Sequence, residues 1–321
     1  SCGVASLGCL GVIAFLGRTE NHAAQRQPQQ QPDTQQQQDP LLQPEEELLD
    51  TDMDTKEAPK SDTVTITEKK GLEGPWITDP ELQAALPRRA IAENRLRGYL
   101  HLRQREVQAW LDQAQAMGRM NKEEFEKEMI TVEEEVNTQT NTILYNLSDP
   151  NARRDYLAQF GCSKWSEKAL KVVASYGPLI EMGAGLGHWE KQLRERKVNI
   201  IAVDNNSQLP VPNVRIFEPE FIGKVETGDE KVILKHPNRT LLMVYPGPTT
   251  MAADALKLYK GSTLLYVGET LGGVNASPEF FEMLEKDWQC VRVEPVEPFA
   301  EGFERLYVMQ RKNSAKKGWF W

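Results

Sequence analysis

A chain of 321 residues has room for one sizeable folded core and a smaller unit beside it. Its formal charge of -9 at pH 7 argues against general nucleic-acid binding through a phosphate-neutralising basic surface, although a local basic patch stays open. The four cysteines, Cys2, Cys9, Cys162 and Cys290, have neither metal-ligand spacing nor the density of a disulfide framework, so we expect reduced thiols at the last two.

The N-terminal part differs from the rest of the chain. Residues 1–20 form an apolar leader whose run at 2–16 is shorter than the roughly 20 residues that a membrane-spanning helix needs. It is either the remnant of a processed signal, transit or anchor segment, or a leader without a structural role. Residues 21–75 are rich in Gln, Pro and acidic residues, which predicts a disordered linker. The compartment stays open between cytoplasmic and organellar, with membrane tethering through the leader as one option.

A helical hairpin is predicted over residues 76–150. Apolar residues recur at spacings of three and four between positions 90 and 117, which is the helical period. Gly118 provides the turn, and Asn121 then caps a second helix with Glu124 as its capping-box partner. The many charges on this hairpin are either a solvated face or a surface for a protein partner.

Residues 151–312 alternate short apolar runs with helical stretches, which is typical of a parallel sheet covered by helices on both faces. The predicted strands lie at 178–182, 199–204, 213–217 or 224–227, 240–245, 262–268, 289–296 and 305–311. The predicted helices lie at 165–175, 187–197, 229–236, 250–259 and 277–287. The last two strands have no helix between them, so we expect them to pair antiparallel.

The most informative segment is a strand that runs into closely spaced glycines, Gly183, Gly185 and Gly187, and then into a helix. Glycine permits positive φ and lets the backbone approach a ligand closely. A dinucleotide fingerprint would need a further glycine at position 188 or 190, where the chain has His188 and Glu190. A tight turn without a ligand is the alternative.

This segment resembles motif I of the class I S-adenosylmethionine-dependent methyltransferases. The acid that ends the first strand is Glu181, and Gly183, Ala184, Gly185 and Gly187 follow it. The resemblance implies that the turn lies under the methionine part of S-adenosylmethionine, and that Glu181 lies near the cofactor's ammonium group or orders the loop. It also implies an α/β fold with a Rossmann-like sheet, mostly parallel and ending in an antiparallel strand.

Acidic residues after the next two strands extend the resemblance. Asp204 ends the second strand at the carboxyl edge of the sheet, where open α/β sheets bind ligands. The resemblance assigns it to the ribose hydroxyls, with Asn205 beside it; a helix N-cap is the alternative. Asp229 is implied at the adenine amino group, or it caps the following helix.

The fourth strand ends in Tyr245 and Pro246, where many amino-directed methyltransferases have Asn or Asp before Pro-Pro-Tyr. The departure weakens a prediction of amine methylation. A sparsely characterised branch of the superfamily resembles this chain more closely, at Trp189, at Tyr245-Pro246 and at Glu269, and it has no established substrate. We expect Tyr245, Pro246 and Glu269 to line the acceptor side, and His188 is a candidate base.

The expected function is therefore methyl transfer from S-adenosylmethionine to an unknown acceptor, a small molecule or a protein. Alignment of the reacting atoms and exclusion of water supply most of the acceleration, so we expect no metal. The aromatic segment 155–165 is expected to close over the pocket. One rival is a non-catalytic subunit or assembly factor that binds a partner through the hairpin; another, a nicotinamide oxidoreductase, is disfavoured by His188. The tail at 313–321 suits a membrane interface or a partner groove, or is a cloning remnant.

Overall fold

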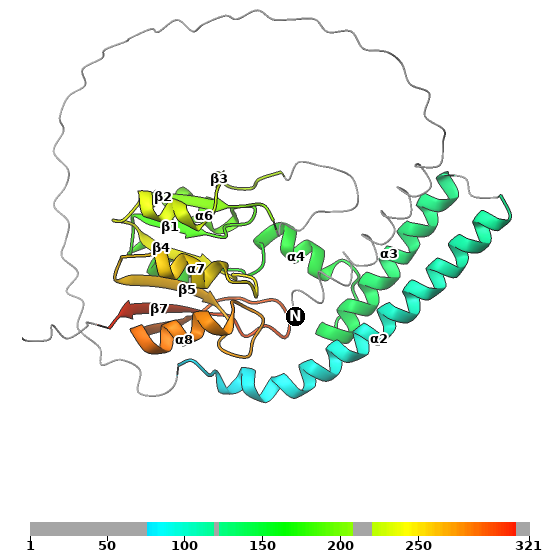
Figure 1. The fold of residues 1–321 in the computed structure, drawn as a ribbon, viewed down its shortest axis with the longest axis horizontal. Helices are drawn as coiled ribbons and strands as arrows, with labels where there is room; N and C mark the ends of the chain where they lie inside the picture. Colours follow the sequence, from blue (N-terminus) through cyan, green and yellow to red (C-terminus); the bar gives the residue numbers. More distant parts are fainter. Residues whose placement is uncertain (1–75, 119–121, 208–219, 313–321) are drawn as a thin grey trace, which may run out of the picture.

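The computed structural model describes residues 76–118, 122–207 and 220–312, which form an α/β unit with a helical hairpin at one end (Figure 1). Several expectations lie outside the described residues. They are the leader at 1–20, the linker at 21–75, the cap at Asn121, the alternative strand at 213–217 and the tail at 313–321.

A seven-stranded sheet in the order β3-β2-β1-β4-β5-β7-β6 is the centre of the unit. Its strands are β1 (Leu179–Met182), β2 (Ile200–Asp204), β3 (Val225–Thr227), β4 (Thr240–Val244), β5 (Thr263–Gly268), β6 (Trp288–Pro295) and β7 (Arg305–Arg311). Neighbours from β3 to β5 pair parallel, whereas β7 pairs antiparallel with both β5 and β6. The expected mostly parallel sheet with an antiparallel end is confirmed.

Helices cover both faces of the sheet because side chains alternate along each buried strand. Leu241 and Met243 of β4 pack on the face covered by the 3-10 helix η1 (Glu230–Lys235) and by α7 (Met251–Leu258) and α8 (Pro278–Asp287). Leu242, between them, packs on the opposite face, against α5 (Glu167–Ala174) and α6 (His188–Glu195). The two resulting cores hold the strands in place, and this positions the loops that follow the strand ends.

The hairpin consists of α2 (Pro80–Ala116) and α3 (Lys122–Tyr145). Helix α2 begins ten residues before the apolar period at 90–117, because Asp79 caps it and Pro80 takes the first helical position. The Asp79 carboxylate accepts hydrogen bonds from the backbone N–H groups of Glu81 and Leu82. A further helix, α4 (Ala152–Phe160), occupies part of the segment that was expected to close over the pocket.

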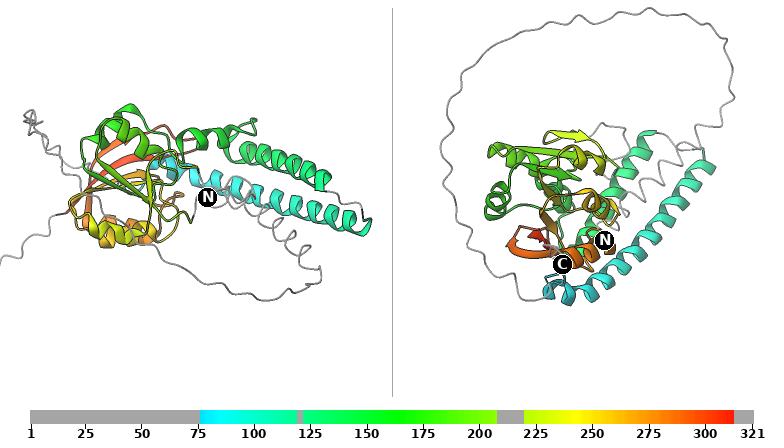
Figure 2. Two further views of the ribbon diagram at one scale, coloured as in Figure 1. Left: turned by 90° about the horizontal axis from the view of Figure 1, so that it is seen from above. Right: turned by 60° about the vertical axis from the view of Figure 1, so that its left-hand side comes forward.

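The hairpin projects from the sheet domain, but its inner end belongs to that domain (Figure 2). The rings of Trp76 and Tyr307 lie 5.9 Å apart, and Ile77 is buried in the core beneath α7 and α8. The Nε of Arg305 at the start of β7 lies 2.9 Å from the Asp79 carboxylate. The outer part has only a small core of its own, formed by Val107, Leu111, Val132 and Val136. The two parts of α2 therefore have different neighbours.

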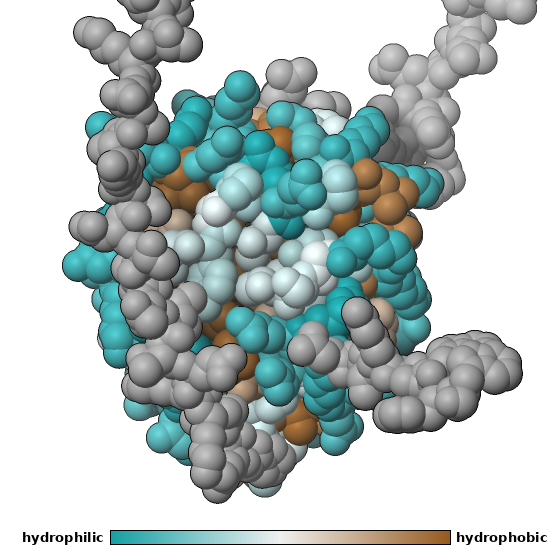
Figure 3. Space-filling view, turned by 90° about the vertical axis from the view of Figure 1, so that its left-hand side faces the viewer, coloured by the Kyte–Doolittle hydropathy of each residue, from teal (hydrophilic) through white to brown (hydrophobic). Residues whose placement is uncertain are grey.

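The parallel strands point their carboxyl ends toward the hairpin (Figure 1). The opposite end of the unit presents a mostly hydrophilic surface with small separate hydrophobic spots (Figure 3). A ligand site on this sheet is therefore expected on the hairpin side, at the carboxyl edge. Within the three described ranges, no helix has the length and apolar character needed to cross a membrane.

Candidate functional site

The strand order reverses between β1 and β4. From β1 the chain adds β2 and β3 on one side, and then returns to add β4 and β5 on the other. Open α/β sheets bind ligands at the carboxyl edge beside such a reversal. The glycine turn follows β1 and Tyr245 follows β4, so the sequence-predicted residues flank this position.

Each glycine of the turn has a positive φ: 73° at Gly183, 56° at Gly185 and 82° at Gly187. A Cβ on Gly183 would lie 2.8 Å from the Met251 Cε, and one on Gly187 would lie 2.9 Å from the Gly223 Cα. The Gly187 contact is with backbone that cannot yield, whereas the Met251 methyl group ends a flexible side chain and can shift. The positive φ at all three positions and the packing at Gly187 therefore favour glycine, and the turn leaves bare backbone at the strand tip.

Asp204 connects the end of β2 to this turn. Its Oδ2 accepts the Gly185 N–H at 2.8 Å, and its Oδ1 accepts the Asn206 N–H at 2.7 Å. Each carboxylate oxygen keeps a second lone pair for a ligand hydroxyl. Among the described residues no helix begins at Asp204, so its bonds order two loops instead. The side chain of Asn205, next along the chain, accepts from the N–H and hydroxyl of Ser207.

Glu181 is buried at the end of β1, with 1% of its surface exposed. Its Oε2 has no hydrogen-bond partner among the described residues. Burial, reinforced by the nearby carboxylates of Glu190 and Asp204, raises the pKa of Glu181 to about 8. A buried polar atom without a partner destabilises the fold. A cationic group of a ligand placed here would satisfy it.

Two predicted residues have other neighbours. The Oδ1 of Asp229 accepts the Lys231 N–H at 3.1 Å at the start of η1, which is the capping alternative. The His188 ring packs beside Gly161, and its Nε2 lies 3.1 Å from the carbonyl oxygen of Ala158. Burial lowers the pKa of His188. The ring faces α4, and it does not line the cavity that contains Tyr245 and Glu269.

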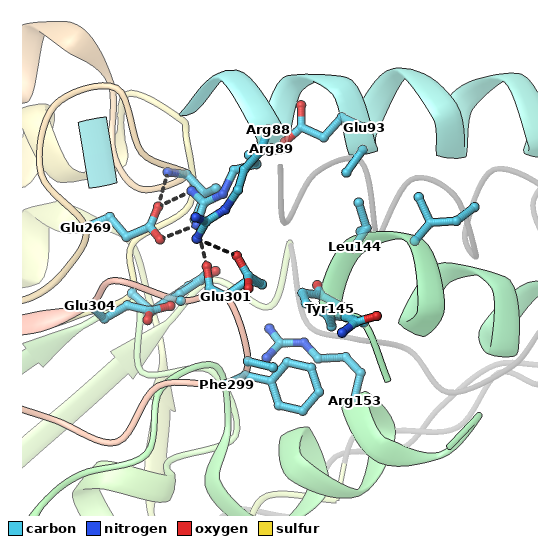
Figure 4. Close-up of a pocket in the computed structure, with 17 residues that line it drawn as sticks. Arg88, Arg89, Glu93, Leu144, Tyr145, Arg153, Glu269, Phe299, Glu301 and Glu304 are labelled. Carbon is cyan, nitrogen blue, oxygen red and sulfur yellow. Dashed lines mark hydrogen bonds and ion pairs between the residues drawn. The ribbon is translucent and has the colours of Figure 1, made fainter. Parts of the chain in front are cut away.

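That cavity has a volume of about 250 Å³ and lies between the carboxyl edge of the sheet and the inner ends of α2 and α3 (Figure 4). Its walls include Arg88, Arg89, Tyr145, Arg153, Tyr245, Glu269, Phe299, Glu301 and Glu304. Tyr245 adopts a φ of 51°, a conformation that costs a non-glycine residue free energy and that clusters at functional sites. Pro246 is not part of the lining, and its carbonyl accepts hydrogen bonds from Asn275 and Ala276.

All four acceptor positions of the Glu269 carboxylate are taken by protein groups. Arg89 of α2 donates to both oxygens at 2.7 Å, and the N–H groups of Val274 and Phe303 donate at 3.0 and 3.1 Å. Glu269 thus fastens α2 to the tip of β5, with no acceptor position left for a substrate proton. Its place at this edge follows from the sequence, whereas its partner Arg89 lies 180 residues away and has no motif to mark it.

Glu304 was not singled out from the sequence. It precedes β7, lines the cavity and is 6% exposed, and its Oε2 has no partner among the described residues. Burial, followed by the nearby Glu269 carboxylate, raises the pKa of Glu304 to about 7. Nothing in the local sequence distinguishes this glutamate from a solvated one, because the cavity that it lines is completed by residues of α2, α3 and α4.

Comparisons with protein-family models and with curated proteins give no match. A search of solved structures gives matches to 35 chains. One belongs to a structure described as "Conversion of a Disulfide Bond into a Thioacetal Group during Echinomycin Biosynthesis". It is 10% identical over 50% of this chain and 92% of that chain, with a TM-score of 0.31. A likeness at this level carries no argument, so the α/β assignment rests on the sheet itself.

Proposed function

We propose that this chain is an S-adenosylmethionine-dependent methyltransferase. The observation that carries the proposal is the group of residues at the strand reversal. There the positive-φ glycine turn is hydrogen-bonded to Asp204, and Glu181, two residues before Gly183, is buried with its Oε2 unpartnered among the described residues. S-adenosylmethionine would supply the electrophilic methyl group on its sulfonium.

Each element of this group suits one part of the cofactor. Glu181 would receive the ammonium group, which satisfies Oε2 and lowers the raised pKa. The bare backbone of the glycine turn would lie against the methionine part. The free lone pairs of Asp204 would accept the ribose hydroxyls. Asp229 is left in its capping role, so the adenine contact of the proposal has no residue assigned to it.

The acceptor would occupy the cavity that Tyr245 lines, since Tyr245 follows β4 directly beside the strand reversal. The inner end of α2 covers this cavity, which keeps water from the reacting atoms. The protein's contribution to rate is then alignment of the nucleophile with the methyl group and the leaving sulfur.

Gly185→Val tests the proposal, with Gly118→Val as its matched control. Both glycines have a similar positive φ, 56° and 62°, so both substitutions strain the backbone. A Cβ at Gly118 meets nothing within 4 Å, whereas Gly185 lies in the proposed cofactor site. We expect the parent and Gly118→Val to bind S-adenosylmethionine by isothermal titration calorimetry and Gly185→Val to lose binding while it remains folded. A parent that binds no S-adenosylmethionine at millimolar concentration contradicts the proposal.

A non-catalytic methyltransferase-like subunit is the second candidate. The saturated carboxylate of Glu269 and the tyrosine at position 245 favour it, because neither provides a free acid at the expected acceptor positions. The two candidates differ in turnover. Transfer of a radiolabelled methyl group from S-adenosylmethionine to any component of a cell lysate supports the enzyme. Cofactor binding with no transfer supports the subunit.

A further inference from the structure

The cavity beside Tyr245 contains one buried acid that the proposed function has not used. Glu304 precedes Arg305, which pairs with Gly268 at the end of β5. It therefore lies at the same edge of the sheet as Tyr245, although it comes from an antiparallel strand sixty residues further along the chain. This is the edge at which the methyl acceptor would enter.

Most charges around the cavity are paired. Arg88 lies 2.9 Å from Glu301, and Arg89 lies 2.7 Å from Glu269 (Figure 4). Glu304 is buried, as Glu269 is, but its Oε2 has no partner among the described residues. A buried carboxyl oxygen in this state favours a ligand that donates a hydrogen bond or carries positive charge.

The aromatic walls favour the same kind of ligand. The rings of Tyr145 and Phe299 meet edge to face with centroids 4.8 Å apart, and the Arg153 guanidinium already lies 4.9 Å from the Phe299 centroid. Aromatic faces attract cations through the quadrupole of the ring. An anionic ligand would instead face the carboxylates of Glu304 and Glu269 across the same small volume.

We propose that this cavity takes a protonated amine as the methyl acceptor, and that Glu304 both binds the amine and accepts its proton. The inference rests on the proposed methyltransferase function. It also accounts for the missing Asn or Asp after β4, because the acid would be supplied by the loop before β7.

The chemistry is a proton transfer followed by a substitution. The Glu304 carboxylate takes one proton from the ammonium group, which frees the nitrogen lone pair. That pair forms the new N–C bond to the methyl group while the C–S bond breaks. Its electrons stay on sulfur, and the products are S-adenosylhomocysteine and the methylated ammonium. Burial and Glu269 raise the pKa of Glu304 to about 7, while Arg153 and Arg89 oppose the rise, and a base that titrates near neutral pH suits this step.

The charge preference is tested with three probes of similar shape: phenethylamine, which is cationic, phenethyl alcohol, which is neutral, and phenylpropanoate, which is anionic. They are titrated into the full chain with and without S-adenosylmethionine, and hexylamine serves as a second amine. We expect both amines to bind and the neutral and anionic probes to bind at least about tenfold more weakly. Glu304→Gln should lower amine affinity by about tenfold or more, because it loses a charged hydrogen bond. Glu297→Gln, in the same loop but paired with Lys164 outside the cavity, should leave amine affinity unchanged.

The outcomes separate this inference from the proposed function. Cofactor binding without amine binding, or amine affinity unchanged in a folded Glu304→Gln variant, overturns the inference and leaves the methyltransferase standing. Tighter binding of phenylpropanoate also overturns it. Amine binding that depends on Glu304 in a chain that binds no S-adenosylmethionine removes the methyltransferase and leaves an amine site. Labelled methyl transfer to phenethylamine that is lost in Glu304→Gln supports both.

Discussion

At the scale of single residues, two buried acids define the site. Most buried polar atoms in proteins have a hydrogen-bond partner. Among the described residues, the carboxyl oxygens that lack one belong to Glu181 and Glu304. They lie at the same carboxyl edge of the sheet, one at the end of β1 and the other beside the end of β5. A ligand bound at that edge would give each of these oxygens a partner if it placed a cationic group beside it.

The stability advantage of Glu181→Gln over the wild type should grow as the pH rises. The pKa of Glu181 is about 8 in the folded chain and about 4.5 in the unfolded chain. Below the lower value both states are protonated. Between the two values the unfolded chain ionises and the folded chain does not, so the wild type loses up to roughly 1.4 kcal/mol per pH unit. Glutamine removes this loss.

The measurement is the melting temperature of wild type and Glu181→Gln from pH 5 to pH 8.5. The difference should widen in favour of the variant until about pH 8 and then level off. Glu304 contributes a loss of the same sign in both proteins, so it cancels in the comparison. S-adenosylmethionine should raise the melting temperature of the wild type more than that of the variant. A difference independent of pH contradicts the assigned ionisation.

At the scale of elements, the sheet could be read from the sequence and much of the cavity could not. Every described strand lies within two residues of its predicted range, because central strands buried on both faces leave short continuous apolar runs that the sequence shows. The glycine turn directly follows β1 and Asp204 is the last residue of β2, so the same apolar runs placed both at strand ends. Of the two alternative positions of the third strand, 224–227 matches β3 at Val225–Thr227, and 213–217 lies outside the described residues.

The missed elements depend on contacts between distant segments. Helix α4 has no fully buried side chain, and it is held by ring contacts such as that of Tyr156 with Phe299 at 5.0 Å. The early start of α2 was signalled by Asp79 and Pro80, but Pro87 inside the helix obscured that signal. Glu304 lines a cavity together with residues of these two helices, which lie far from it in the sequence. Local sequence patterns therefore revealed the residues at the strand ends, Tyr245 and Glu269 among them, and not the helix residues that complete the cavity.

Arg89→Ala should lower the free energy of unfolding far more than Arg88→Ala, although the two residues are adjacent on α2. Arg89 is 17% exposed and pairs with the 1% exposed Glu269, so its removal leaves a buried carboxylate short of two donors. Loss of one partner of such a pair costs about 3–5 kcal/mol. Arg88 and Glu301 are 63% and 45% exposed, and that pair contributes about 0–1 kcal/mol.

Urea unfolding of the two variants and the wild type gives the free energies directly. Equal losses for Arg88→Ala and Arg89→Ala would show that the Arg89–Glu269 pair does not hold α2 to β5. If Arg89→Ala lowers the free energy of unfolding more, it should also weaken ligand binding in the cavity, because α2 forms one of the cavity walls. Because Arg88 lines the same cavity, both substitutions can affect binding. The two variants are therefore compared by their free energies of unfolding.

At the scale of the whole molecule, the hairpin and the sheet share one site. The cavity takes its walls from α2, from α3, from Arg153 of α4 and from the strand edge. The inner end of the hairpin thus forms a wall of the cavity, while its outer part extends away from the sheet (Figure 2). Changes to the two ends of α2 should have different consequences.

Two N-terminal deletions distinguish the inner end of α2 from the segment that precedes it. Deletion of residues 1–70 keeps every contact described above, so we expect an unchanged melting temperature and unchanged cofactor binding.

Deletion of residues 1–90 removes Ile77 and Leu82 from the core, together with the Asp79–Arg305 and Arg89–Glu269 ion pairs. Buried aliphatic side chains contribute about 2–5 kcal/mol each, and the buried pair a similar amount, against a typical total stability of about 5–15 kcal/mol. The longer deletion should therefore leave no cooperative thermal transition. A folded product with the parent's melting temperature would show that the sheet domain closes without α2, and the cavity proposed for the acceptor would then lack a necessary wall.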